Sequence, residues 1–315
     1  MGKLILKRLL ETIPVLLILA TMAFFMMRLA PGNSFDQEKP MPAHVREAIA
    51  AQYGFDAPLW TQYVRFLGLV PSPNGERAGL LQGDLGMSRK YEGWRVSELM
   101  GPKIKVSLEL GFYALLIAIG IGVTVGVFAA YRPHSAMDHV PMSLAMLGIC
   151  LPTFVLGPLL IAFFALQMGW FNVSGWFVPS DRVLPALTLG LFYAAFIARL
   201  TRASMLEVRT QDYIRTARAK GVSGWRVYGV HGLRNGILPV LSYLGPAAAG
   251  LVSGSFVVET IFRVPGLGRF FVEAAINRDE TLVIGCALFY ATLLILLNLI
   301  AELTQAMINP KLRLS

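Results

Sequence analysis

Six long apolar stretches constrain this chain more than any other feature of its sequence. A helix of about 20 predominantly apolar residues crosses the hydrocarbon core of a bilayer, and each stretch approaches or exceeds that length. Only 15% of the residues are charged, against about a quarter in soluble domains. The sequence therefore predicts an all-α polytopic membrane protein with about six transmembrane helices. The stretches cover roughly residues 9–29, 105–131, 137–168, 183–206, 236–258 and 281–307.

The first stretch, Leu9 to Leu29, is predicted to be a retained membrane span. It is longer than the ~7–15 residues of a signal-peptide core, and "RLAPGNS" follows it in place of a small-residue cleavage site. Lys and Arg gather in the loop 207–235 and in the tail after Ala306, which six spans would place on the same side as the N-terminus. Because basic residues mark cytoplasmic loops, we expect both termini to lie in the cytoplasm.

The segment between the first two stretches differs in composition from the rest of the chain. It mixes acidic and basic residues with Pro and Gly, and it predicts a small extracytoplasmic insert that is short for an independent domain. Within it, "MPAHVREAIAAQYGF" and "PLWTQYVRFLGLV" are predicted to form amphipathic helices, and "GLLQGDLGMS" a turn-rich loop. The predicted parts are 1–30 with the first span, the insert 31–103, and a core domain 104–315 that contains the basic loop 207–235.

The basic loop allows several interpretations from its residues alone. A nucleic-acid-binding helix pair is disfavoured, because its binding face would be tied close to the bilayer. A voltage sensor would carry arginines at regular spacing inside an apolar span, and Thr210, Gln211, Asp212 and Ser223 interrupt that spacing here. Two interpretations stay open: a projecting element that docks on a partner, and a solvated basic loop that contacts lipid headgroups.

Small residues favour the docking interpretation. Thr216, Ala217 and Ala219 lie within about one helical turn and would let another surface approach closely. Gly221 ends the predicted helix and permits a sharp turn. A second short amphipathic run, Trp225 to Leu233, follows. The pattern predicts a helix–glycine–helix knob.

The residues of this knob resemble a known motif. "YIRTARAKG", followed by "H…RNGILPV", is similar to the EAA loop of binding-protein-dependent ABC importer permeases, and specifically to the dipeptide/oligopeptide/nickel branch. Arg215 stands where many permeases carry Glu, and the gap from Gly221 to Pro239 is longer than in the general pattern; both departures are usual for this branch. The matching residues are Tyr213, Arg215, Thr216, Ala217, Arg218, Ala219, Lys220 and Gly221.

Three further segments carry the same resemblance in the same order along the chain. "MMRLAPGNSF" is similar to the end of the family's first span, and "GDLGMS" to its extracytoplasmic signature. "GSFVVETIFRVPGLGRFFVEAAINRDETLV" is similar to its fifth-span signature, with Thr281 where many members have Pro. The resemblance implies the type I ABC importer permease fold, and within the branch it is strongest to the B-type subunits of oligopeptide importers.

The resemblance also implies a function and partners. The basic loop would form a coupling helix that docks on one of two cytoplasmic ATPases, which would hold ATP and Mg, so that this chain itself needs no cofactor. A second, homologous permease subunit would complete the pore, and an extracytoplasmic peptide-binding protein would deliver short oligopeptides. The bacterial inner membrane is the expected location. Dipeptides, nickel or glutathione remain alternative cargoes on this branch.

The segment "ETIFRVPGLGRFF" is predicted to contribute to the extracytoplasmic gate or mouth. Its Pro and Gly residues preclude a regular span, and irregular backbone near membrane depth occurs where it is buried in protein or lines a cavity. An ordinary turn is the alternative, and the carboxylate of Glu259 could simply pair with Arg263. The predicted gate residues are Glu259, Phe262, Pro265, Gly266, Gly268, Arg278 and Asp279.

Small residues in the stretch 236–258 suggest a second role beside helix packing. Gly250 and Gly254 form a Gly-x-x-x-Gly pattern that permits close helix contact, as do Gly122 and Gly126 in the stretch 105–131. The resemblance adds that this span lines the translocation path. The candidate path residues are Gly250, Ser253 and Gly254.

Several function classes lack support in the sequence. It holds no G-x-x-x-x-G-K-[ST] phosphate-binding motif, no nucleophile–base constellation and no cysteine–histidine metal spacing. We therefore predict a transport subunit and not an enzyme, with no nucleic-acid partner. An ion-coupled transporter would more often show paired broken helices and mid-membrane carboxylates, and a membrane-anchored signalling or assembly protein would show no transport.

Overall fold

The computed structural model describes residues 2–29, 54, 56–71, 75, 79–91 and 93–308. Its described residues are mostly helical, with a single isolated bridge between Met87 and Arg95. The chain forms two compact units. The first is built mainly from Val106–Arg269 and the end of the last helix, and the second from Leu6–Lys105 and Phe270–Thr292.

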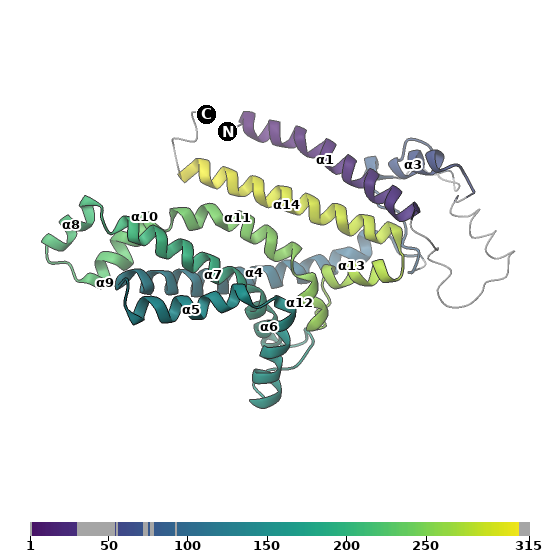
Figure 1. The fold of residues 1–315 in the computed structure, drawn as a ribbon. Helices are drawn as coiled ribbons and strands as arrows, with labels where there is room; N and C mark the ends of the chain where they lie inside the picture. The colour runs from purple at the N-terminus through teal and green to yellow at the C-terminus, as the bar shows by residue number, and fades with distance from the viewer. Residues whose placement is uncertain are drawn as a thin grey trace. The chain divides into compact units, whose positions relative to one another are not determined.

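The helices follow one another along the chain, and Figure 1 labels those named α. Up to the basic loop they are α1 (Gly2–Leu29), α3 (Leu59–Leu67), η1 (Leu80–Gln82), α4 (Val96–Tyr131), α5 (Ala136–Cys150), α6 (Thr153–Leu160), η2 (Ile161–Gln167), η3 (Pro179–Arg182) and α7 (Val183–Val208). Beyond it they are α8 (Asp212–Ala219), α9 (Gly224–Arg226), η4 (Val227–Gly232), α10 (Leu233–Gly236), α11 (Leu238–Ser253), α12 (Phe256–Ile261), α13 (Leu267–Ile276) and α14 (Glu280–Ile308).

Five helical segments are long and apolar enough to cross a membrane, and a sixth candidate is a bent pair. This confirms the predicted class and the predicted number of about six spans. The five are Leu10–Leu29, Val96–Tyr131, Pro179–Val208, Leu238–Ile261 and Glu280–Thr304.

The predicted span over 137–168 is not one straight helix. It consists of α5 and the α6–η2 segment, bent by 112° to each other. Pro152 lacks the N–H that would continue the α5 ladder, and its ring pushes the preceding residue out of the helical region. Leu151 accordingly takes an extended conformation, with φ −90° and ψ 117°. A hydropathy pattern alone does not show this break.

Helix α7 lies at the centre of the first unit and packs against α5, α6 and α11. Small residues make the approach close: a Cβ on Gly122 of α4 would lie 2.7 Å from the Ala194 carbonyl, and one on Gly126 would lie 2.7 Å from the Ala198 carbonyl. Gly148 of α5 similarly faces the backbone of α7. The Gly122–Gly126 pattern is therefore a packing device, as predicted.

The second unit joins the predicted insert to two spans. Phe24 of α1 stacks on Phe66 of α3, with ring centroids 5.2 Å apart, and both belong to a cluster with Ile284 and Leu288 of α14. The amphipathic helix predicted in "PLWTQYVRFLGLV" is confirmed as α3, and "GLLQGDLGMS" is turn-rich as expected. The helix predicted over 41–55 lies outside the described residues, apart from Gly54.

Candidate functional site: the basic loop and two carboxylate clusters

The basic loop begins with a short amphipathic helix placed at the end of a candidate span. Three residues separate the end of α7 from the start of helix α8. Its Ile214 is fully buried and packs with Val208 and Val227, and Ala217 joins the same cluster. Residues three apart share one face of a helix, so Ile214 and Ala217 together form the inner face of α8.

The opposite face of α8 is exposed and basic. Thr216 and Ala219 are exposed small residues, as a docking surface requires. Arg215 keeps 73% of its side chain exposed and makes only a loose contact with Asp212, at 3.6 Å. Ala217, which the sequence grouped with the contact residues, is half-buried against the chain's own cluster. The exposed set is Tyr213, Arg215, Thr216, Arg218, Ala219 and Lys220.

Gly221 ends α8 in the left-handed conformation, with φ +73°. Its N–H donates to the Arg218 carbonyl at 2.9 Å, and the N–H of Val222 donates to the Ala217 carbonyl at 3.2 Å. This double closure is a Schellman motif, for which Gly is favoured because it has no Cβ. Nothing lies within 4 Å of where a Cβ would be, so the requirement comes from the backbone angle. The predicted helix–glycine–helix arrangement is present.

Arg218 is held by the chain itself. Its guanidinium hydrogen-bonds the Tyr228 hydroxyl and lies over the Tyr228 ring, 5.3 Å from the centroid. Tyr228 in turn meets Tyr131, the last residue of α4, edge to face at 5.5 Å. Arg218 therefore ties α8 to η4, and Tyr228 of η4 in turn contacts α4. The side chains of Arg215 and Lys220 are exposed.

An ion pair that the sequence analysis missed lies between α5 and α7. Arg202 donates to the two carboxylate oxygens of Asp138 at 2.5 and 2.7 Å, and the His134 N–H adds a third bond at 2.9 Å. Asp138 is only 1% exposed. The signal was available, since Arg202 lies in a predicted span and ionisable residues there usually have a defined partner. The pair braces the end of α7 that leads into α8.

Glu259, the first predicted gate residue, is fully buried. One of its carboxylate oxygens accepts from the hydroxyls of Ser107 and Ser255, both at 2.7 Å. The other accepts from the backbone N–H of Arg269 at 3.0 Å. The Ser107 hydroxyl oxygen also accepts from the N–H of Leu267 at 2.8 Å. The carboxylate thus binds the turn after α12 to α4 at Ser107, within the first unit.

The glycines of "VPGLG" allow this turn to close. A Cβ on Gly266 would collide with the Glu259 carboxylate, and one on Gly268 would lie 2.7 Å from the Phe256 backbone. Phe262 is buried in the main core of the first unit, whereas Pro265 is exposed. The segment is a tightly bound turn, and a role for it in a gate stays a prediction.

Asp279 organises a second carboxylate cluster, in the second unit. It is 1% exposed and accepts from the Ser88 hydroxyl at 2.5 Å and from the N–H groups of Arg89 and Lys90 at 3.1 and 3.2 Å. It also caps α14, because it accepts the N–H of Leu282 at 3.2 Å. The structure therefore brings together the "GDLGMS" and "NRDETLV" segments, which lie about 190 residues apart.

Neighbouring residues complete this cluster. Thr281 donates to the Met87 carbonyl at 2.8 Å, and Glu280 pairs with Arg89 at 2.8 Å and with Arg28 at 3.4 Å. Tyr91 lies 5.9 Å from the Phe270 ring; burial, with a contribution from nearby carboxylates, raises the pKa of this tyrosine above its usual value. Arg278, exposed with φ +54°, precedes the cap.

The candidate path residues lie at the end of α11. Gly250 faces α7, because a Cβ there would collide with the Tyr193 hydroxyl. Ser253 is partly buried, and Gly254 falls at the break between α11 and α12. Close helix packing accounts for Gly250, and a place on the translocation path stays a prediction. Among the described residues, no three His, Cys, Asp or Glu side chains form a group that could hold a metal ion.

Comparison with known proteins places the chain in a family. Residues 122–314 match the model of the binding-protein-dependent transport system inner membrane component family. The oligopeptide transport system permease protein OppB of Haemophilus influenzae is 42% identical over 99% of this chain and 100% of its own length. The dipeptide transport system permease protein DppB of Bacillus subtilis is 37% identical over 100% of this chain and 99% of its own.

A solved structure shares the fold. The crystal structure of an amino acid ABC transporter with histidines aligns with a TM-score of 0.52 at 18% identity, covering 67% of this chain and 94% of that one. The likeness confirms the predicted type I importer permease fold. Together with the apolar helices and the full-length relatives, it shows that the chain belongs to the binding-protein-dependent transport system inner membrane components, as an integral membrane transport subunit and not an enzyme.

Proposed function

We propose that the chain is one permease subunit of an ATP-driven importer that moves short oligopeptides from a binding protein into the cytoplasm. The cargo follows from the full-length relative named as an oligopeptide permease. The observation that carries the mechanism is α8: a short helix with an exposed basic face, fastened to η4 by Arg218 and to α7 by its buried face.

Helix α8 has the properties of a coupling element. Thr216 and Ala219 permit a close approach, and Arg215 and Lys220 can set the register against an acidic partner surface. The Arg218 contact and the inner cluster attach α8 firmly to the bundle. A movement imposed on α8 would therefore reach the spans as a rigid displacement, the usual form of such transitions.

The proposed complex contains four kinds of chain. Two cytoplasmic ATPases carry ATP and Mg and receive the coupling helices, a second homologous permease subunit completes the pore, and a peptide-binding protein delivers cargo from outside. The chain lies in a bacterial inner membrane with both termini in the cytoplasm, as the distribution of Lys and Arg favours. In this orientation the segment 259–280, between the last two predicted spans, falls on the extracytoplasmic side of the chain.

Co-purification and transport measurements test this proposal. The chain is purified from its native membrane, and the ATP hydrolysis of the recovered complex is measured with empty and with peptide-loaded binding protein. We expect ATPases to co-purify and the loaded binding protein to stimulate hydrolysis. Transport that persists without ATP and follows an ion gradient would refute the proposal, as would a complex without any ATPase.

Dipeptides are the second candidate cargo, favoured by the full-length likeness to a dipeptide permease. Competition distinguishes the two. Reconstituted vesicles are loaded with binding protein and a labelled tetrapeptide, and unlabelled dipeptide or tetrapeptide is added in excess. Inhibition by the tetrapeptide alone would support oligopeptide import. Stronger inhibition by the dipeptide would favour the second candidate.

A further inference from the structure

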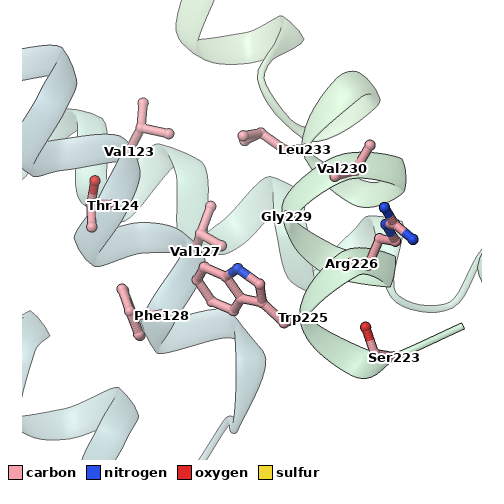
Figure 2. Close-up of a pocket in the computed structure, with 10 residues that line it drawn as sticks. All are labelled: Val123, Thr124, Val127, Phe128, Ser223, Trp225, Arg226, Gly229, Val230 and Leu233. Atoms are coloured by element: carbon pink, nitrogen blue, oxygen red, sulfur yellow. The ribbon is translucent and has the colours of Figure 1, made fainter.

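A groove of about 470 Å³ opens beside the coupling element, between the last turns of α4 and the segment from Ser223 to Leu233. It lies within the first unit, and its residues are outside the set that the family motif identifies. One wall comes from α4 and the other from α9, η4 and α10, as Figure 2 shows. The lining residues are Val123, Thr124, Val127, Phe128, Ser223, Trp225, Arg226, Gly229, Val230 and Leu233.

The chemistry of the groove changes along α4. At the end of the helix, the Trp225 ring lies 5.1 Å from the Phe128 ring and 6.1 Å from the Tyr131 ring. Ser223 and Arg226 belong to the same turn of chain as Trp225 and supply a hydroxyl and a positive charge. One turn or more toward the middle of α4, the walls become apolar, because Val123 and Leu233 pack against the same buried cluster.

The part of the groove toward the middle of α4 offers almost no free polar group. The Thr124 hydroxyl donates to the Gly120 carbonyl of its own helix at 2.6 Å, so this hydroxyl is already engaged within α4. Val230 is 60% exposed and Trp225 is 51% exposed. The groove therefore has one polar, positively charged end and one apolar end, which is the polarity of an amphiphile.

The position of α4 identifies the class of occupant. Helix α4 is long and apolar enough to be a candidate span, and the groove opens near its end at Tyr131. Exposed Trp at a span end is typical of the membrane interface. Arg226 is exposed, and the ion pairs found among residues 93–308 do not include it. Its charge is thus available to an anionic headgroup.

We propose that this groove binds one anionic phospholipid. An acyl chain lies against Val123, Val127 and Leu233, and the headgroup phosphate meets Arg226 and Ser223. The bound lipid braces η4, whose Tyr228 holds Arg218 of α8, so the lipid supports the coupling element from its membrane side. The proposal depends on the chain lying in a membrane and not on which cargo it transports.

Photo-crosslinking in the whole importer complex tests the site. Val230 is replaced by the photoreactive residue benzoylphenylalanine, and the complex is placed in nanodiscs of phosphatidylcholine with phosphatidylglycerol as the minor lipid. Mass spectrometry identifies what has been crosslinked. The matched probe is Leu144 of α5, which is 63% exposed and reports the bulk lipid. One arginine near an anionic lipid surface predicts about fivefold enrichment of phosphatidylglycerol at Val230 over Leu144.

Two charge variants decide the role of Arg226. Arg226→Gln should abolish the enrichment, whereas Arg234→Gln removes the same charge from an exposed position outside the groove and should preserve it. Crosslinks from Val230 to an ATPase or to the second permease would overturn the proposal. So would equal headgroup fractions at the two probes, or an enrichment that survives Arg226→Gln.

Discussion

Breaking the Asp138–Arg202 ion pair should destabilise the bundle that carries the coupling helix. Asp138→Asn removes the buried charge that accepts two bonds from Arg202. Removing one partner of a buried ion pair costs about 3–5 kcal/mol. The Arg202 side chain is 27% exposed and can regain some water, so we expect the lower end, about 3 kcal/mol.

Thermal unfolding of the purified complex measures this cost. In larger domains, a loss of 1 kcal/mol of stability lowers Tm by ~2 °C or more. The expected loss of about 3 kcal/mol therefore corresponds to a decrease of roughly 6 °C in apparent Tm. The complex is heated in detergent and the remaining intact fraction is read by size-exclusion chromatography. The double variant Asp138→Asn with Arg202→Gln leaves no unpaired charge, and it should be little less stable than the single Asp138→Asn variant.

The Glu109–Arg182 pair provides a matched control. It has the same charges at 2.8 Å, but its side chains are 35% and 23% exposed. The two pairs differ in their carboxylates, since Glu109 is 35% exposed and Asp138 only 1%. A carboxylate in contact with water brings the pair close to the surface case, worth about 0–1 kcal/mol, so Glu109→Gln should lower the apparent Tm by less than roughly 2 °C. Equal shifts for the two pairs would refute the reasoning from burial. A double variant at Asp138 and Arg202 whose loss equals the sum of the single losses would refute the direct interaction.

Four further outcomes follow from the site geometry. Gly221→Ala should cost about 1 kcal/mol through its positive φ and reduce peptide-stimulated ATP hydrolysis, whereas Gly221→Asn, which tolerates this conformation, should retain most of it. Ala219→Trp changes the exposed face, so it should leave Tm unchanged and abolish ATPase co-purification. Ala217→Trp changes the inner face and should lower Tm. The reverse pattern would show that the two faces are misassigned. Gly266→Ala places a methyl group against a buried carboxylate and should lower Tm by an amount corresponding to about 1–3 kcal/mol. Asp279→Ala leaves a hydroxyl and several backbone N–H groups unsatisfied, so it should cost about 2–3 kcal/mol and speed proteolysis of the 83–91 segment. Unchanged proteolysis would argue against the bonds between Asp279 and residues 88–90.

The sequence by itself determined the membrane class, the approximate spans and the form of the basic loop. Every backbone N–H and C=O of a segment inside the hydrocarbon needs a hydrogen-bond partner within the protein. Apolar runs of spanning length are therefore expected to form helices, which satisfy these groups within the segment. The turn at Gly221 was equally predictable, since a glycine after a short helix with small residues is the usual signal for a left-handed end. These features depend on local backbone conformation and on composition, both of which can be deduced from a single sequence.

Only the tertiary structure decided which partners the polar residues take. Charge patterning could not show that Arg218 binds Tyr228 while Arg215 stays exposed, because the difference depends on which face of α8 meets η4. Nor could it bring Ser88 to Asp279, about 190 residues apart, or place two serine hydroxyls on Glu259. In each case the hydrogen-bond partner of the polar side chain depends on how the helices are rotated and packed. That packing results from close contacts between elements that are distant in the chain.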